Sequence, residues 1–266
     1  MENRINVSKV KQFWENNPLC SHNIPFKTGS RDYYRYFDKL REDNESIEFS
    51  YRLHEYESFN GMKVLDIGCG NGYVLNHYSM NGAITTGIDL TWTGIQLSRK
   101  RFEMDKKNGC FLNANGEDLP FKNNSFDCVC SMGVLHHTPE IERALDEIYR
   151  VLKPGGRLIL MFYNKNSYRN RILYPVAKAV LPSCWNKSLQ QLRNENDGIG
   201  NPLASVYSVE DLKQMLEKFS GLEFFTGYCK REDFLFFGKY IPSLMIKFIA
   251  KRFGWFLYVK GIKEIK

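Results

Sequence analysis

A glycine-rich turn in the first third of the chain carries the residue types best suited to holding a ligand. An apolar run at 63–67 leads directly into Gly68, Gly70 and Gly72, and a helical pattern follows. Glycine lets the backbone turn tightly and approach a ligand with no Cβ in the way, and the first N–H groups of a helix are free donors. The spacing G-x-G-x-G differs from the dinucleotide fingerprint, which has its third glycine one position later, where this chain has Tyr73.

Two carboxylates flank this turn. Asp66 lies two residues before the first glycine, and Asp89 ends the next apolar run, 21 residues after Gly68. A carboxylate at the end of the second strand of such a unit accepts hydrogen bonds from both hydroxyls of a ribose. The glycine turn and Asp89 together therefore indicate a ligand that contains a ribose.

Two adjacent histidines, His136 and His137, follow a later apolar run at 126–132. Open α/β sheets bind ligands beyond the carboxyl ends of their strands, and a histidine there can take a proton from a reacting group. Because only one of two successive side chains points inward, we favour His137 as a base or substrate contact. The alternative is that both histidines shape the turn and reach a ligand only through their backbone.

The elements that would position these residues follow from periodicity. Residues 61–163 alternate short apolar runs with helical stretches, a pattern typical of βα units and a parallel sheet. The expected strands are 63–67, 84–90, 110–114, 126–132 and 157–163, and the expected helices are 73–80, 93–107 and 140–152. A helix at 208–219 and two more strands at 222–230 and 255–262 follow.

Five segments in order resemble the motifs of class I S-adenosylmethionine-dependent methyltransferases, in the small-molecule group with Leu-His-His after the fourth strand: Asp66-Ile-Gly-Cys-Gly-Asn-Gly72, Gly87-Ile-Asp89, 115–121, 125–139 and Arg150-Val-Leu-Lys-Pro-Gly-Gly156. The resemblance implies an α/β, Rossmann-like, mostly parallel seven-stranded sheet with an antiparallel last strand, helices on both faces and an N-terminal helical lid. The segments 13–18 and 197–202 also resemble a methyltransferase subgroup, which would place Trp14, Asn17 and the 197–207 loop on the substrate side.

The resemblance further implies how S-adenosylmethionine is held. Gly68 and Gly70 would hold its methionine part, and Asp66 would orient the ammonium group. Asp89 would take the ribose hydroxyls and Leu90 would pack on the adenine. The other residues expected around the cofactor are Asn115, which would accept from the adenine amine, Gly116, which would donate its N–H, and Cys69, Gly72, Glu117, Ser131, Met132 and Tyr33, the last from the lid. The alternatives are glycines that serve only the turn, Asp89 as a helix cap and Asn115 in a plain loop.

Methyl transfer is an in-line displacement, so orientation and exclusion of water do most of the work, and a hydroxyl or ammonium acceptor also needs a base. O-methylation is slightly favoured over N- or C-methylation. The fourth strand ends in Ser131 and lacks both the Asn/Asp-Pro-Pro-Tyr of enzymes that methylate DNA amines and the aspartate of catechol-type metal sites. We therefore expect no metal and no nucleic-acid substrate.

The net charge of +7 belongs to the last third of the chain. Residues 1–60 and 61–163 are near neutral, whereas residues 164–266 hold 17 basic and 9 acidic side chains. This partition suggests a lid or substrate region at 1–60, a cofactor-binding core at 61–163, and a substrate-binding insertion with the final strands of the same domain at 164–266. The basic, aromatic segments 164–194 and 234–263 favour a hydrophobic or anionic acceptor, or peripheral contact with an anionic membrane; the alternative is a solvated rim.

The seven cysteines lack the spacing of a disulfide framework or zinc site, and no signal peptide or spanning segment is recognisable, so a cytoplasmic protein is expected, at most peripheral to the inner face of a membrane. Three hypotheses remain: a small-molecule methyltransferase, a methyltransferase of a lipid, quinone or lipid-linked acceptor, and a cofactor-binding regulatory protein without turnover. The sequence does not give the oligomeric state.

Overall fold

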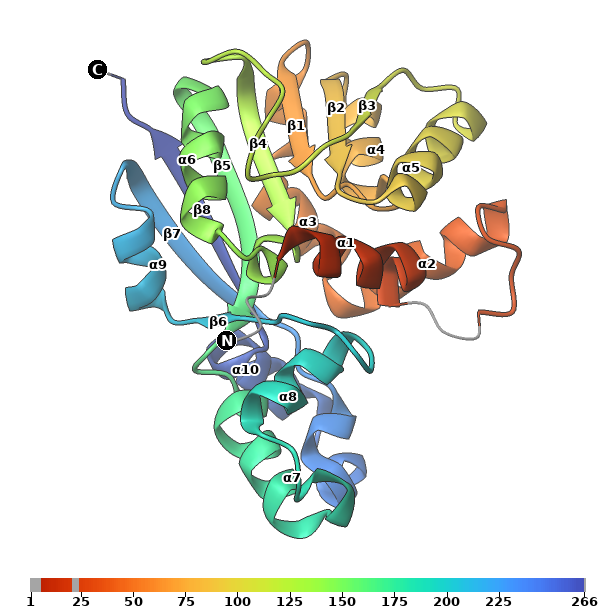
Figure 1. Cartoon of the computed structure of the whole chain (residues 1–266), viewed down its shortest axis with the longest axis vertical. Coiled ribbons are helices and arrows are strands. Elements are labelled where there is room, and N and C mark those ends of the chain that lie inside the picture. The colour runs from red at the N-terminus through yellow and green to blue at the C-terminus, as the bar shows by residue number, and fades with distance from the viewer. Residues whose placement is uncertain (1–5, 21–23, 266) are drawn as a thin grey trace.

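The computed structural model describes residues 6–20 and 24–265, and a twisted sheet runs through their centre (Figure 1). Within these residues the strand order is β3-β2-β1-β4-β5-β8-β7, with the short β6 paired to the end of β5. Among the described strands β8 alone runs in the opposite direction, so its pairings with β5 and β7 are antiparallel. The strands are β1 (Lys63–Ile67), β2 (Ile84–Asp89), β3 (Cys110–Asn113), β4 (Phe126–Met132), β5 (Leu152–Asn164), β6 (Val206–Tyr207), β7 (Phe219–Gly227) and β8 (Phe256–Lys263).

The α-helices are α1 (Val7–Asn16), α2 (Arg31–Asn44), α3 (Ile47–His54), α4 (Tyr73–Met80), α5 (Trp92–Met104), α6 (Ile141–Val151), α7 (Tyr174–Val180), α8 (Leu189–Asn194), α9 (Val209–Met215) and α10 (Ser243–Phe253). Shorter helical turns are η1 (Pro18–Cys20), η2 (Tyr56–Phe59), η3 (Leu135–His137), η4 (Arg169–Leu173), η5 (Pro182–Cys184), η6 (Glu195–Asp197) and η7 (Arg231–Tyr240). The expected α/β fold class, with helices on both faces and an antiparallel last strand, is confirmed; β6 is an addition.

Both faces of the sheet are covered, which explains why the central strands are apolar throughout rather than alternating. On one face Leu65 and Val129 pack with the apolar side chains of α6 and α9. On the other face their neighbours Val64 and Cys128 pack with α3 and α4. Because successive side chains of a strand point to opposite faces, one apolar run serves both cores.

Helices α1 and α2 lie near the carboxyl ends of β1 and β2, where the arrows of Figure 1 end. The carboxylate of Glu15, in α1, accepts from the backbone N–H of Trp92 (2.8 Å) and Thr93 (2.9 Å) at the start of α5. Helix α2 is tied to the same helix by Tyr34, whose hydroxyl donates to the Leu97 carbonyl at 2.7 Å. Both helices are thus fixed to α5 and close over the sheet edge.

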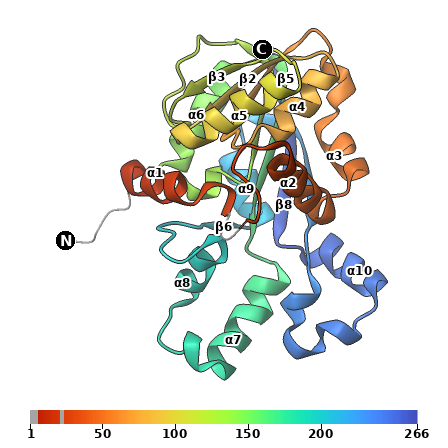
Figure 2. The same ribbon diagram turned by 90° about the vertical axis from the view of Figure 1, so that its right-hand side faces the viewer.

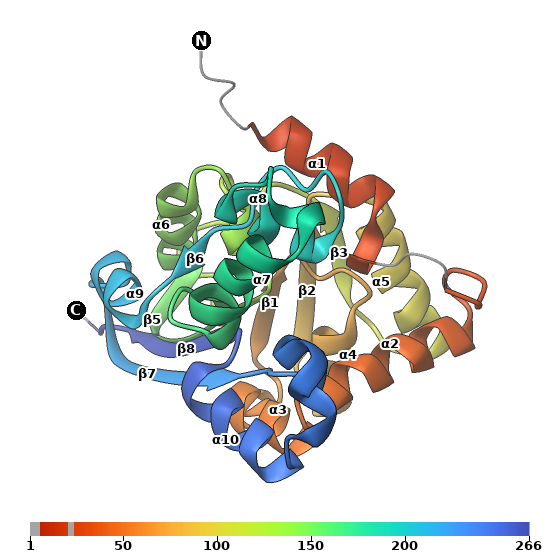
Figure 3. The same ribbon diagram turned by 90° about the horizontal axis from the view of Figure 1, so that it is seen from below.

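Helices α7, α8 and α10, with η7, form the end of the molecule opposite β3 and the upper loops (Figures 2 and 3). The expected helix at 208–219 is shorter, ending at Met215, and it begins with the capping box of Ser208 and Asp211. None of the described helices has both the length and the apolar character needed to cross a bilayer. The division of the chain at residues 60 and 163 stays a prediction.

Two of the basic residues attributed to an exposed C-terminal surface are buried in β8. Lys260 pairs with Glu55, and the Lys263 ammonium donates to the carbonyls of Leu152 and Tyr149, each at 2.7 Å. The prediction was wrong for these two lysines because a strand inside the sheet directs their side chains inward.

Candidate active site

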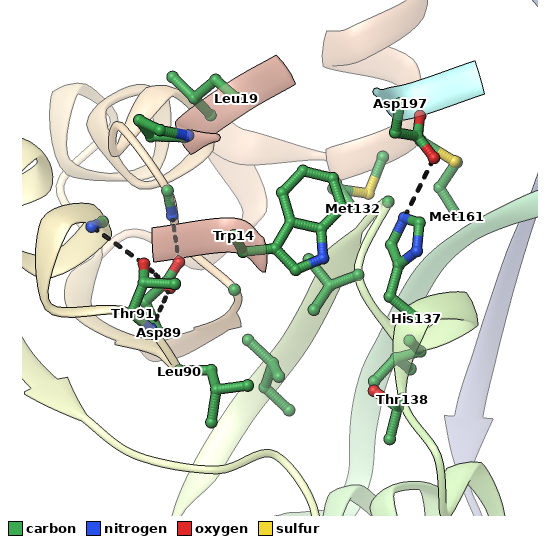
Figure 4. A pocket seen from close by; sticks show the side chains of 18 of the residues that line it. Trp14, Leu19, Asp89, Leu90, Thr91, Met132, His137, Thr138, Met161 and Asp197 are labelled. Atoms are coloured by element: carbon green, nitrogen blue, oxygen red, sulfur yellow. Dashed lines mark hydrogen bonds and ion pairs between the residues drawn. The ribbon is translucent and has the colours of Figure 1, made fainter. Parts of the chain in front are cut away.

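A cavity of about 810 Å³ lies at the carboxyl ends of β1, β2 and β4. One end is formed by the glycine turn, the end of β2 and residues 114–117, and the other by side chains that include His137, Tyr163 and Asp197. Figure 4 shows Trp14 between these two ends, with Asp89 on one side and His137 on the other. The two ends of one cavity are therefore lined by different residues, with Trp14 between them.

The backbone of the glycine turn favours glycine at three positions. Gly68, Gly70 and Gly72 have φ of 77°, 52° and 76°, a left-handed backbone that other residues adopt at a cost. A Cβ on Gly68 would also lie 2.3 Å from a methyl carbon of Val134. The turn is thus packed against the segment after β4, and its backbone borders the cavity directly.

Asp89 is held in place by the loop around it. One carboxylate oxygen accepts from the Gly70 N–H at 2.9 Å, and the other from the N–H and hydroxyl of Thr91 at 2.8 and 2.6 Å. Burial raises the pKa of Asp89, and these hydrogen bonds oppose the rise. Gly94, which sequence reasoning missed, leaves room for the carboxylate, since a Cβ there would approach it to 2.6 Å.

Beneath the glycine turn, Asp66 is buried and does not line the cavity. Burial raises its pKa to about 7, against the charge of Arg41, and its Oδ1 has no hydrogen-bond partner among the described residues. Arg41, from α2, lines the cavity and donates to Glu45 at 3.0 Å. The Arg41 cation at this end of the cavity suits the carboxylate of an amino acid, whereas the unsatisfied oxygen of Asp66 lies behind the cavity wall. Sequence reasoning missed Arg41, because nothing local distinguishes it from other helix arginines.

At the far side of this end, Leu90, Asn115, Gly116 and Glu117 line the cavity. The side-chain oxygen of Asn115 accepts from the N–H of Glu117 at 3.1 Å. The Glu117 carboxylate accepts from the N–H of Glu140, at the start of α6, at 3.1 Å. The loop is therefore stiffened by its own polar side chains, and Leu90 supplies an apolar surface.

Several predicted site residues lie behind the wall. Ser131 is buried and donates to the Ile67 carbonyl at 2.9 Å, which joins β4 to β1. Tyr33 packs in an aromatic cluster with Tyr34 and Phe37. The cavity is lined by Gly68, Gly70, Asp89, Leu90, Asn115, Gly116, Glu117, Met132 and His137, and not by Asp66, Cys69, Gly72, Ser131, His136 or Tyr33. From α2 the lining residues are Phe37, Leu40, Arg41 and Asn44.

The two histidines are placed differently. His136 is fully buried and its ring lies 3.8 Å from that of Tyr163, centroid to centroid. His137 lines the cavity, and its Nδ1 lies 2.5 Å from the carbonyl oxygen of Leu203. Because a carbonyl only accepts, Nδ1 carries the hydrogen and Nε2 of the neutral ring is left with a lone pair. Burial lowers the pKa of His137, while Asp197 and the Leu203 carbonyl oppose this.

Asp197 and Tyr163 complete this end. The Asp197 Oδ2 lies 3.7 Å from His137 Nε2, and the Tyr163 hydroxyl donates to Asp197 Oδ1 at 2.5 Å. Asn201 also donates to Asp197, at 3.3 Å. The Trp14 ring contacts the His137 ring edge to face, with centroids 4.9 Å apart. A buried carboxylate thus faces the nitrogen that would become cationic on taking a proton.

The outer wall of this end is aromatic and basic. Arg169 lines the cavity and forms an ion pair with Asp233 at 2.7 Å. Its guanidinium carbon lies 5.0 Å from the centroid of the Tyr228 ring. Trp255 and Phe256 also line it. No group of three or more His, Cys, Asp or Glu in residues 6–20 and 24–265 is arranged to hold a metal ion.

Residues 65–160 match the family model described as a methyltransferase domain. The match covers the glycine turn, Asp89 and both histidines, and together with the fold it confirms the expected methyltransferase domain. The particular group with Leu-His-His after the fourth strand stays a prediction.

Among curated proteins the chain is similar to phthiotriol/phenolphthiotriol dimycocerosates methyltransferase of Mycobacterium leprae, with 34% identity over 114 residues, 42% of each chain. It is also similar to the ubiquinone biosynthesis O-methyltransferase of Coxiella burnetii, with 30% identity over 43% of this chain and 49% of the relative. The chain thus matches less than half the length of these relatives. The similarity falls on the methyltransferase domain.

Two solved structures extend the likeness of fold over nearly the whole chain. Magnesium protoporphyrin IX methyltransferase from Synechocystis PCC 6803 with bound SAH superposes with a TM-score of 0.63 over 97% of this chain and all of its own, at 13% identity. The [4+2]-cyclase SpnF superposes with a TM-score of 0.56 over 97% of this chain and 96% of its own, at 16% identity. The fold accepts more than one chemistry, so the activity is argued from the site.

Proposed function

We propose that the chain is an S-adenosylmethionine-dependent methyltransferase that transfers a methyl group to a hydroxyl of a small, partly apolar acceptor. The observation that carries this proposal is the position of His137. Its ring lines the cavity at the end opposite the glycine turn, with Trp14 between them, and its unprotonated Nε2 is buried, faces Asp197 at 3.7 Å and has no hydrogen-bond partner among the described residues. A base for the acceptor and a cradle for the cofactor therefore face each other across one cavity.

The residues of the glycine-turn end fit S-adenosylmethionine in three places. Arg41 lines the cavity and suits the carboxylate of its methionine part. The contact of Asp66 with the ammonium group stays a prediction, because Asp66 does not line the cavity. Asp89 is fixed by backbone donors where ribose hydroxyls would donate to it. Leu90 offers an apolar surface for the adenine, and the 114–117 loop lines the cavity beside it. When bound, the cofactor supplies an electrophilic methyl group on a sulfonium ion.

The chain's own residues would handle the proton of the acceptor. The hydrogen of the acceptor hydroxyl would pass to His137 Nε2 as its oxygen takes the methyl group, whose bond to the sulfonium sulfur would break and leave a neutral thioether. The resulting imidazolium lies 3.7 Å from Asp197, whose charge stabilises it, and the Leu203 carbonyl keeps the ring oriented. Trp14 covers the junction of the two ends and excludes water. Asp197 and Tyr163 act as positioning residues.

The lining of the acceptor end favours a lipid-like or aromatic molecule. Met161, Tyr163, Tyr228, Trp255 and Phe256 provide apolar and aromatic surface. The M. leprae relative's name refers to dimycocerosates, and the C. burnetii relative's name to ubiquinone biosynthesis, which supports an acceptor with an apolar part.

Calorimetry with S-adenosylmethionine tests the cofactor part. We expect binding that Asp89→Ala weakens by at least about tenfold, because two hydrogen bonds to a charged group are lost. Thermal melting of the variant would show that the fold is intact. Absence of binding by the unsubstituted protein would refute the proposal.

Transfer of a radiolabelled methyl group tests the acceptor part with three probes: catechol, 4-dodecylcatechol and dodecylamine. We expect most label on 4-dodecylcatechol and none on the amine. His137→Gln should lower this transfer by about a hundredfold or more while leaving cofactor affinity unchanged. Label on the amine alone, or full turnover by the His137 variant, would contradict O-methylation with a histidine base.

A further inference from the structure

We propose that the surface formed by η7 and α10 docks on an anionic lipid bilayer and brings the acceptor end of the cavity to the membrane. The docking part stands by itself; the delivery of an acceptor rests on the function proposed above. We call this surface the basal patch and define it by five exposed apolar side chains, Phe237, Tyr240, Leu244, Met245 and Phe248, and four basic ones, Lys239, Lys247, Lys251 and Arg252.

The apolar side chains of the basal patch are highly exposed to solvent. Leu244 is 79% exposed, Phe248 65%, and Phe237 and Tyr240 each 72%. Large apolar side chains gathered on one surface mark a site of interaction. Leu244 and Phe248 are four residues apart in α10 and so lie on one face of the helix.

Helix α10 has a second face that anchors it to the protein. Ile246 is buried, and the Lys251 carbonyl accepts from the Thr226 hydroxyl of β7 at 2.6 Å. The exposed apolar residues are therefore held outward by a docked helix. Figure 3 looks toward this end of the molecule and shows α10 beside the last strands.

The four charged side chains of the basal patch are all basic, and the two acidic residues of η7, Glu232 and Asp233, lie in its first turn. Residues 234–263 contain no aspartate or glutamate. Among the ion pairs of the described residues, none involves Lys239, Lys247, Lys251 or Arg252. Lys and Arg next to exposed aromatic and aliphatic side chains suit lipid phosphates above acyl chains.

The chain segments that carry the basal patch lead directly to residues that line the acceptor end of the cavity. Trp255 and Phe256, which follow α10 directly, line the cavity, as do Lys230 and Glu232 at the start of η7. An acceptor with an apolar chain could therefore stay anchored in the bilayer while its head group reaches His137.

A bilayer fits better than a second copy of the chain. A symmetric pair would place the same four cations opposite each other, because both partners of such a contact use the same surface, and like charges across an interface oppose binding. An acidic protein would satisfy the charges, and the experiment below separates it from a bilayer.

Sedimentation with extruded vesicles tests the docking directly. We expect the full chain to partition onto phosphatidylglycerol–phosphatidylcholine vesicles at about 0.1 M NaCl, and to be released at about 1 M NaCl or from phosphatidylcholine alone. The double variant Lys247→Gln/Lys251→Gln should bind about thirtyfold more weakly, since each lysine near an anionic surface contributes a factor of about five. Phe248→Glu should also lose at least about tenfold.

The matched controls are Met80→Glu and Lys122→Gln, at exposed positions away from η7 and α10; both should bind vesicles as the unsubstituted protein does. No partitioning onto anionic vesicles, or basal variants that bind like the controls, would overturn docking on a bilayer and leave an acidic protein as the partner. Concentration-dependent dimerisation that Phe248→Glu abolishes would overturn it in favour of a second copy. Cofactor calorimetry on each variant keeps a failure of the proposed function separate from a failure of docking.

Discussion

Glu15 offers the sharpest test of how the site is assembled, because one side chain holds α1, and with it Trp14, against the start of α5. Its carboxylate accepts three hydrogen bonds, from the N–H of Trp92 and from the N–H and hydroxyl of Thr93. Partial burial raises the pKa of Glu15, but the bonds from Thr93 and Trp92 outweigh it and the pKa falls below its usual value. The tether is therefore charged at neutral pH.

Glu15→Ala removes all three bonds. At about 1 kcal/mol for each bond in this partly exposed position, the docking of α1 should weaken by about 3 kcal/mol, which is more than about a hundredfold in the equilibrium between docked and released helix. Thr93→Val removes only the hydroxyl bond and should weaken docking by about fivefold. Glu15→Gln loses the charge but keeps an acceptor and should fall between the two.

Hydrogen exchange of the α1 amides measures this opening directly, since exchange reports local unfolding below the global limit. The expected order of protection is unsubstituted protein, Thr93→Val, Glu15→Gln, Glu15→Ala, with the amides of β1 and β4 unchanged in all four. Protection of α1 that is the same in Glu15→Ala as in the unsubstituted protein would refute the reasoning. Loss of protection throughout the sheet would show that Glu15 stabilises the whole fold instead.

Two further predictions concern the base and the glycine turn. Because burial lowers the pKa of His137, the acid limb of the pH profile of kcat/KM should lie below the usual histidine pKa of about 6.5. Asp197→Asn removes a charge that raises this pKa, so it should shift the limb to still lower pH and reduce the rate. A limb above about pH 7 in the unsubstituted enzyme would contradict a neutral buried base. Gly68→Ala should lower the free energy of unfolding by about 2–5 kcal/mol, the sum of the cost of a left-handed alanine and of a clash with Val134. Thermal melting should show partial recovery of stability when Val134→Ala is added. Equal melting temperatures of the single and double variants would show that the clash does not contribute.

Short sequence patterns predicted the parts of the site that are formed by residues close together in the sequence. The expected strand at 63–67 is β1, and Gly68 and Gly70 line the cavity as their spacing indicated. Tyr33 shows the limit of such reasoning: α2 does cover the cavity, but the turn of the helix presents Phe37 and Arg41 to it. A choice among neighbouring helix residues depends on packing that the sequence of the helix alone does not contain.

The acceptor end was harder to predict for a different reason. His137, Tyr163, Asp197 and Arg169 come from four separate segments, and their meeting depends on the path of residues 164–205, which we call the insertion. The resemblance of the flanking segments placed Trp14 and the Asp197 loop on the substrate side without a role for either. The bond of Asp197 to Tyr163 and its approach to His137 appear only in three dimensions.

Two hydrogen bonds join the insertion to η3, which carries both histidines. The Leu203 carbonyl accepts from the His137 ring, and the Ser205 N–H donates to the His136 carbonyl at 2.9 Å. Whatever changes the insertion therefore also moves the base. An experiment that exchanges segments to change the acceptor preference should therefore exchange the insertion together with η3. Replacement of residues 164–205 alone would change the lining of the acceptor end but leave His137 without the contacts that orient its ring.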